Sequence, residues 1–195
     1  VTARMIEKLA VLERQNINWA SDNVRLAEEM SFVEAYLELQ KYRFGNRLHY
    51  EIDLPQTCAD YYIPKLTLTT FAENACVHGM EKKTSACWIY VRVYLKESLL
   101  YIEIEDTGGG MEEEVVAKMN ESMRCCTIED IKENTHIGIL NACLRLKMIS
   151  KGNVEFFLES EKGVGTFMTI KVEAGYLQTK EQEGQYHVDE SDVSG

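Results

Sequence analysis

Residues 73–79 read Glu-Asn-Ala-Cys-Val-His-Gly, and residues 106–111 read Asp-Thr-Gly-Gly-Gly-Met. On a helix, Asn74 and His78 are four positions apart, so they share one polar face. The same face carries Thr67 and Thr70. The opposite, apolar face carries Leu68, Phe71, Ala72, Ala75 and Cys76. A core helix does not need a polar stripe, so the first string indicates a ligand site.

The second string follows residues 100–105, whose alternating pattern predicts a strand that ends at Asp106. The glycine run after Asp106 lets the backbone approach a ligand closely. A carboxylate at a strand end can accept a hydrogen bond from an amine such as that of adenine. The two strings together therefore predict a nucleotide site.

The rest of the chain divides into short elements. Helical spacing of apolar residues covers residues 1–19, and Ser21-Asp22-Asn23 supplies a turn before a second helix that ends at Gly45-Asn46. The further predictions are a strand at 48–54, the motif helix at 64–80, paired strands at 86–95 and 99–106, a polar segment at 111–136, a helix at 139–149, and a hairpin at 154–159 and 165–172. Apolar periodicity stops at Gly175, which predicts a disordered acidic tail.

Composition narrows the class of protein. The chain has 195 residues, 45% of them hydrophobic, and a net charge of -11. That length suits one globular domain with an appendage, and the acidic charge argues against a nucleic-acid partner. The six cysteines lack metal-ligand or disulfide spacing and indicate reduced thiols. With no signal peptide or membrane-spanning run of about 20 apolar residues, we expect a cytoplasmic domain. Because it starts without Met in an apparent helix, we expect a fragment of a longer, membrane-anchored protein.

The order of the motifs resembles the GHKL ATPase superfamily, which includes gyrase, heat-shock chaperones, histidine kinases and MutL. Within it, the chain is similar to sensor histidine kinases of the LytS/YesM-like class over residues 24–173. The residues that carry the resemblance are Tyr-Leu-Glu-Leu-Gln-Lys-Tyr-Arg-Phe-Gly-Asn-Arg-Leu at 36–48, Ile-Pro at 63–64, the two strings above, Ile-Gly-Ile-Leu-Asn at 137–141 with Arg-Leu at 145–146, and Gly-Val-Gly-Thr at 163–166.

This resemblance implies an α+β fold, an α/β sandwich of the Bergerat (GHKL) type. Its sheet would be mixed and largely antiparallel, with about five strands, helices on one face and a preceding N-terminal helix. Residues 1–22 would complete a dimerisation and phosphoacceptor hairpin. Residues 23–174 would form the catalytic ATP-binding domain, and residues 175–195 the tail.

The family binds ATP with Mg²⁺, and the resemblance makes Asn74 the metal ligand and a catalytic residue. Alternatively, Asn74 makes a capping or inter-helix hydrogen bond. Glu73 matches an acid that activates water in ATP-hydrolysing relatives, a role that would waste ATP in a kinase, so catalytic and solvated roles stay open. His78 either contacts phosphate or closes the helix end beside Gly79.

Asp106 is implied to bind the adenine amine, with an ordinary turn aspartate as the alternative. Residues 111–136 are the ATP lid by resemblance, and residues 163–166 are a last glycine box or a plain hairpin turn. Arg145 is either a ligand contact or a surface charge. The other implied nucleotide contacts are Gly108, Gly110, Met111, His136, Ile137, Gly138, Ile139, Gly165 and Thr166.

Two positions depart from the family pattern. His136 replaces a glycine, and Val77 stands where lysine or arginine is usual, so one potential phosphate contact is missing. Neither change touches Asp106 or Asn74, and we expect weaker binding rather than an inactive enzyme.

The resemblance implies a kinase domain that transfers the γ-phosphoryl group of ATP to a histidine outside this chain. The class carries its acceptor in a His-Phe-Leu-Phe-Asn-like box, in which none of the four histidines sits, namely His49, His78, His136 and His187. Implied partners are the phosphoacceptor helix, a response regulator and a second copy in a full-length homodimer. The alternatives are an ATP-hydrolysing GHKL machine and a non-catalytic nucleotide-sensing module.

Overall fold

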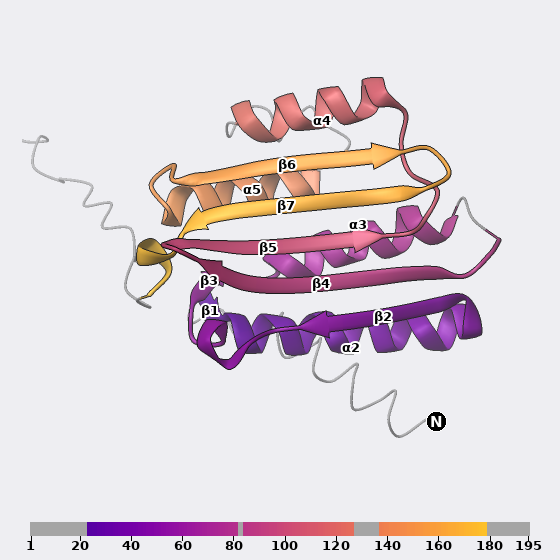
Figure 1. Cartoon of the computed structure of the whole chain (residues 1–195), viewed down its shortest axis with the longest axis horizontal. Coiled ribbons are helices and arrows are strands. Elements are labelled where there is room, and N and C mark those ends of the chain that lie inside the picture. Colours follow the sequence, from indigo (N-terminus) through magenta and orange to yellow (C-terminus); the bar gives the residue numbers. More distant parts are fainter. Residues whose placement is uncertain (1–22, 82–83, 127–136, 179–195) are drawn as a thin grey trace, which may run out of the picture.

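The computed structural model describes residues 23–81, 84–126 and 137–178, and Figure 1 shows their arrangement. Helices and strands alternate along most of the chain. In chain order they are β1 (Asn23–Arg25), α2 (Leu26–Phe44), β2 (Leu48–Asp53), β3 (Tyr62–Pro64), α3 (Thr67–Glu81), β4 (Cys87–Lys96), β5 (Leu99–Asp106), α4 (Glu113–Cys125), α5 (Ile137–Ile149), β6 (Val154–Glu161) and β7 (Gly165–Glu173), with 3-10 turns at Gly45–Arg47, Gln56–Cys58 and Ala174–Leu177.

The main sheet has five strands in the order β2-β4-β5-β7-β6. β2 runs parallel to β4, whereas the other neighbours in this sheet are antiparallel. Both predicted hairpins are present, one joining β4 to β5 and the other joining β6 to β7. The predicted α+β sandwich with a mixed, largely antiparallel sheet is confirmed.

One face of the sheet forms the core of the domain. Side chains along β4 and β5 alternate between buried and partly exposed, as a strand with one covered face requires. The buried residues include Ile89, Val91, Val93, Leu100 and Ile102. In Figure 1, α2, α3 and α5 cover this face, and α4 lies along β6 at the edge of the sheet.

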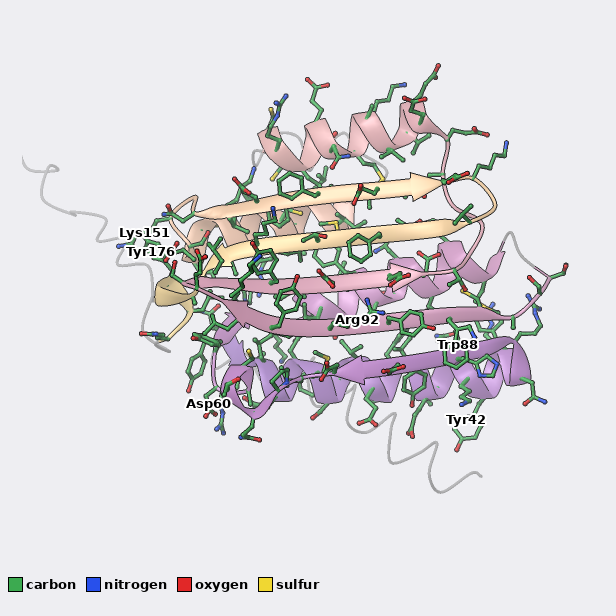
Figure 2. The ribbon with its side chains drawn as sticks, in the orientation of Figure 1. Tyr42, Asp60, Trp88, Arg92, Lys151 and Tyr176 are labelled. Atoms are coloured by element: carbon green, nitrogen blue, oxygen red, sulfur yellow. The ribbon has the colours of Figure 1, made fainter. Side chains whose placement is uncertain are left out.

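The opposite face of the sheet is open and carries aromatic and charged side chains. Trp88 stacks on His49 with ring centroids 4.7 Å apart, and Arg92 Nη1 lies 3.1 Å from Glu105 Oε2. Figure 2 shows Trp88 and Arg92 on this face. Cross-strand pairs of these kinds stabilise a sheet without helices above it.

A small second sheet was not predicted. β1 pairs antiparallel with β3, so that Asn23 faces Pro64. Asn23 is therefore part of a strand rather than of the expected turn, and the motif helix begins at Thr67 instead of Pro64. Proline has no N–H to donate, and Leu66 adopts a left-handed φ of 65° that separates the strand from the helix.

The first half of the expected lid is a packed helix, whereas the sequence predicted only a polar segment there. Helix α4 has acidic residues in its first turn and Arg124 in its last, as the helix dipole favours. Met119 and Met123, four positions apart, are buried. The second half of the lid, residues 127–136, lies outside the described residues.

The C-terminal end is structured for longer than expected. After β7, residues Ala174–Leu177 form a 3-10 turn, and Leu177 is fully buried. A disordered tail therefore cannot begin at Gly175. Residues 179–195 and the predicted helix at 1–19 lie outside the described residues. Within the described part of the chain, no helix is both long and apolar enough to cross a membrane.

Candidate nucleotide-binding site

Helix α3 supplies the polar residues of the first string. Its buried side comprises Leu68, Phe71, Ala72 and Cys76, as predicted, with Ala75 partly buried. Thr67 differs from the expectation of a shared polar face. It is fully buried, and its hydroxyl donates to the Pro64 carbonyl at 2.6 Å. The polar stripe therefore consists of Thr70 and Asn74, which are half-buried, and His78, which is exposed.

The side chain of Asn74 is held in one orientation. Its Nδ2 donates to the Thr70 carbonyl at 2.7 Å. Only the amide nitrogen can donate to a carbonyl oxygen, so this bond directs Oδ1 away from the helix backbone. An amide oxygen is a ligand that Mg²⁺ accepts. The orientation of Asn74 thus fits the role that the resemblance implies.

Asp106 ends β5 and is 6% exposed. Its Oδ1 accepts a hydrogen bond from the Gly108 N–H at 2.8 Å, and across the sheet Asp106 faces Thr166 of β7. The hydrogen bond from Gly108 fixes the Asp106 carboxylate at the C-terminal end of β5. A carboxylate held in this way can accept a further hydrogen bond from an amine without reorganising.

Three glycines make close contacts within the chain, and their expected role beside the nucleotide stays a prediction. A Cβ at Gly108 would lie 2.1 Å from Gly79 Cα. A Cβ at Gly110 would lie 1.9 Å from the Glu161 carbonyl oxygen, and one at Gly165 would lie 1.9 Å from that of Asp106. No side chain fits at such distances. The glycines therefore join the loop after β5 to α3 and to β7.

A pocket brings six of the predicted site residues together. It is small, with a volume of about 50 Å³, whereas pockets for drug-sized ligands measure about 300–1,000 Å³. The predicted residues in its lining are Asn74, His78, Asp106, Met111, Ile139 and Thr166. The remaining lining residues were not predicted as site residues and are Phe71, Ala75, Ile104, Met123, Leu158 and Met168.

The apolar part of the lining carried no distinct signal in the sequence. Ile104 and Met168 alternate along their strands as ordinary core residues do, and Phe71 lies on the apolar face of α3. Met123 comes from α4 and is 1% exposed. Its side chain forms part of the pocket wall, so α4 closes one side of the pocket.

Other predicted residues lie outside this lining. Gly165 lines a neighbouring open cleft with Asp106 and Thr166. Glu73 is exposed, and its negative charge contributes to raising the pKa of Tyr36 in α2, a shift caused mainly by the burial of that phenol. Glu73 therefore lies toward α2, whereas Asn74 and His78 face the pocket.

The start of α5 holds the remaining predicted contacts. Gly138 is exposed, and a Cβ there would lie 3.3 Å from Thr70 Cγ2, so the first turn of α5 lies beside the polar stripe of α3. His136 and the side chain of Ile137 lie outside the described residues. Arg145 Nη1 donates to the Lys65 carbonyl at 2.7 Å, which gives Arg145 a structural role next to the start of α3.

Two polar residues that we did not predict organise the rim of the site. Ser160 Oγ accepts from the Met111 N–H at 2.9 Å and donates to the Gly165 carbonyl at 2.7 Å. Asn120 Nδ2 donates to the Leu158 carbonyl at 2.8 Å, and its Oδ1 accepts from the Leu158 N–H at 2.9 Å. Asn120 therefore pairs with the edge of β6 as a neighbouring strand would, and it fastens α4 there.

The donor set suits a metal that arrives with the nucleotide. Among the residues that the structure describes, no group of three or more His, Cys, Asp or Glu side chains could hold a metal ion. Mg²⁺ at kinase sites is commonly bound by one or two protein ligands together with substrate phosphates and water. Asn74 Oδ1 provides a protein ligand of this kind.

Comparison with known proteins agrees with this geometry. A family profile described as "Histidine kinase" matches residues 1–48. The sensor histidine kinase YesM of Bacillus subtilis is 34% identical over 110 residues, which cover 56% of this chain and 19% of that protein. An uncharacterised sensor-like histidine kinase of Staphylococcus epidermidis is 30% identical over 173 residues, which cover 88% of this chain and 32% of that protein. The sensor protein LytS of Bacillus cereus is 27% identical over 170 residues, which cover 87% of this chain and 28% of that protein.

Solved structures show the same fold. The histidine kinase domain of the Erythrobacter litoralis EL346 blue-light activated histidine kinase superposes with a TM-score of 0.55 at 16% identity, covering 91% of this chain and 76% of that one. The catalytic domain of histidine kinase ThkA superposes with a TM-score of 0.53 at 12% identity, and the match covers 78% of this chain and 96% of that one.

The chain spans a third or less of the length of these three relatives. The matches cover the motif order, the sheet and the pocket described above. The chain therefore belongs to the sensor histidine kinases of the LytS/YesM-like class and has the fold of histidine kinase catalytic domains.

Proposed function

We propose that this domain binds Mg²⁺-ATP and transfers the γ-phosphoryl group to a histidine outside this chain, for relay to a response regulator. The observation that carries the proposal is the convergence of Asn74, His78, Asp106 and Thr166 on one pocket. These residues come from three elements and combine a metal ligand, a phosphate contact and an adenine acceptor.

Each residue has a separate task in this proposal. Asp106 accepts a hydrogen bond from the adenine amine, and Thr166 lies beside it. Asn74 holds Mg²⁺, which supplies charge neutralisation for the phosphates when it is bound. His78 contacts the phosphates. Catalysis of phosphoryl transfer rests on positioning and electrostatic stabilisation, and these groups would supply both.

The placement of the chain in a longer protein belongs to the same proposal. Residues 1–22 would be the second helix of a dimerisation hairpin, residues 23–177 the catalytic domain, and the region after it an acidic tail. The full protein would be a homodimer anchored in the membrane, with this domain in the cytoplasm. The phosphoacceptor helix and the response regulator would be its partners.

Two observations bear on the alternatives. Glu73 does not line the pocket, which disfavours the ATP-hydrolysing alternative, because a general base must reach the attacking water. The small pocket with Met123 in its wall favours the non-catalytic sensing module as the second candidate, since nucleotide binding would then have to displace α4. Such a displacement could be a signal by itself.

The test uses γ-labelled ATP with Mg²⁺ and a purified hairpin that carries the acceptor histidine of the longer protein. Label on the hairpin, lost when the acceptor histidine is replaced by glutamine, is expected for a kinase. Steady release of inorganic phosphate without the hairpin would indicate the ATPase instead. Saturable nucleotide binding with neither product would indicate the sensing module.

A further inference from the structure

Glu29 is a fully buried carboxylate in the first turns of α2. Burial raises its pKa above the usual range, since a charge is disfavoured away from water. Nothing in the proposed chemistry uses this side chain directly. A buried carboxylate is costly to keep, and apolar replacements of buried charges are often stabilising. Its presence therefore calls for a function other than bulk stability.

The partners of Glu29 are all at the beginning of α3. Oε2 accepts from the Leu66 N–H at 3.0 Å, while Oε1 accepts from the Thr69 N–H and from the Thr69 hydroxyl, both at 3.1 Å. The first N–H groups of a helix have no acceptor within the helix and form its positive end. Glu29 thus caps α3 from another helix, with two oxygens that have separate donors.

Together with the other contacts of α3, the Glu29 cap determines the position of this helix in the domain. Arg145 of α5 holds the Lys65 carbonyl just before the helix. At the far end, Gly79 lies against Gly108 so closely that a side chain at Gly108 would not fit. The helix is therefore held at both ends, by Glu29 and Arg145 at its start and by the loop after β5 at its end.

A displacement at the start of α3 reaches the site directly. Asn74 lies five residues after Thr69, which is about 7.5 Å along a rigid helix at a rise of about 1.5 Å per residue. Asp106, by contrast, belongs to β5 and is fixed by the sheet. The distance between the metal ligand and the adenine acceptor thus depends on where the first turn of α3 is held.

We propose that Glu29 is a positioning residue of the nucleotide site, which sets Asn74 relative to Asp106 so that one nucleotide reaches both. The proposal rests on the proposed function, because it assumes that Asn74 holds Mg²⁺ and Asp106 binds adenine. Glu29 itself touches neither the nucleotide nor the metal.

Glu29→Gln is the first variant of the test. An amide has one acceptor oxygen and an NH₂ group that cannot accept, so either Leu66 or Thr69 loses its partner. Thr69→Val removes only the hydroxyl donor to Oε1, and Thr69→Ser keeps it. Glu34→Gln on the exposed side of α2 changes the net charge equally and is the matched control.

The readout is the affinity for a non-hydrolysable ATP analogue by calorimetry, with Mg²⁺ and with chelator, together with thermal unfolding. Glu29→Gln is expected to reduce the gain in affinity that Mg²⁺ provides by about fivefold or more, while the metal-free affinity changes by less than about twofold. Thr69→Val is expected to act in the same direction, whereas Thr69→Ser and Glu34→Gln retain the wild-type gain.

Several outcomes would overturn the proposal. A full Mg²⁺ gain in Glu29→Gln would mean that α3 is positioned without the cap. An equal loss of metal-free and metal-dependent affinity, in step with lower thermal stability, would make Glu29 merely structural. If Glu29→Gln does not fold, an identical Mg²⁺ gain in Thr69→Val and Thr69→Ser overturns it instead. A wild-type domain with no Mg²⁺ gain would overturn the proposed function, and this inference with it.

Discussion

Gly108 rests on Gly79, so the loop after β5 and the C-terminal part of α3 meet through backbone alone. A Cβ at Gly108 would lie 2.1 Å from Gly79 Cα and 2.6 Å from Asp106 Oδ1. This contact brings the strand that carries Asp106 and the helix that carries Asn74 and His78 into one site. It also explains why the glycine string is required even where no ligand touches it.

Gly108→Ala should therefore be damaging, because the methyl group must push α3 away from β5. Overpacking of this kind costs about 1–3 kcal/mol of unfolding free energy, and nucleotide affinity should fall with it. Gly175→Ala is the control, since a Cβ at Gly175 meets nothing within 4 Å. Chemical denaturation measures both variants. Equal stability of Gly108→Ala and the wild type would show that the loop yields freely.

The second prediction concerns adenine recognition. Asp106→Asn keeps one oxygen for the Gly108 N–H but replaces the other by an NH₂ group that cannot accept from the adenine amine. We expect ADP to bind the wild type in preference to GDP, and the variant to bind ADP about tenfold more weakly. Calorimetry with Asp53→Asn as the surface control tests this. Equal affinity of the wild type for both nucleotides would contradict the assignment.

The third prediction separates metal binding from base binding. Asn74→Ala removes the amide oxygen, so Mg²⁺-dependent phosphoryl transfer to the acceptor hairpin should fall steeply. Metal-free ADP binding should stay nearly unchanged, because Asp106 and the apolar walls remain. If a folded Asn74→Ala domain no longer binds ADP, then Asn74 is an ordinary structural residue.

The fourth prediction follows from the packing of α4. Met123 occupies part of a pocket that is too small for a nucleotide, and Asn120 fastens α4 to Leu158. Asn120→Ala removes two hydrogen bonds of about 0.5–1.5 kcal/mol each, which favours the open position of α4. Apparent ATP affinity should consequently rise by about fivefold or more, because the two bonds together contribute about 1 kcal/mol at least.

Lys118→Ala is the control for α4, since Lys118 is exposed on the same helix. Equilibrium binding of a fluorescent ATP analogue compares the two variants with the wild type. Weaker binding in Asn120→Ala alone would reverse the interpretation, because α4 would then support the bound nucleotide rather than exclude it.

The fifth prediction uses the cysteines. Burial, with a smaller contribution from Cys87, raises the pKa of Cys76 from 9.0 to about 12. Because the thiolate is the reactive form, this raised pKa leaves much less reactive thiolate at Cys76 at pH 8. Iodoacetamide should label the exposed Cys125 first and leave Cys76 unmodified in the folded domain.

Peptide mass spectrometry after timed labelling checks this order. Labelling in guanidinium chloride is the control, because both thiols become accessible in the unfolded chain. Equal labelling rates for Cys76 and Cys125 in the folded domain would mean that α3 opens rapidly to solvent. That result would also contradict the tight packing of α3 on the sheet.

Sequence reasoning located strands most accurately where polar and apolar residues alternate over many positions. The alternating segments at 86–95 and 99–106 predicted β4 and β5 to within one residue at each end. Strands β1 and β3 have three residues each, which is too short for a pattern of alternation. Helix α4 escaped notice because most of its surface is polar, and only Met119 and Met123 mark its buried side.

The sequence by itself determined the chemical groups of the site, because an amide, an imidazole and a carboxylate at fixed spacing are properties of neighbours along the chain. The tertiary structure decided which of them meet. Glu29 caps α3 from 37 residues away, and Arg145 reaches Lys65 across 80 residues. Such contacts depend on how helices pack on the sheet, and local periodicity contains no information about them. For the same reason, only the structure revealed that Gly108 contacts Gly79 and that Met123 lines the pocket.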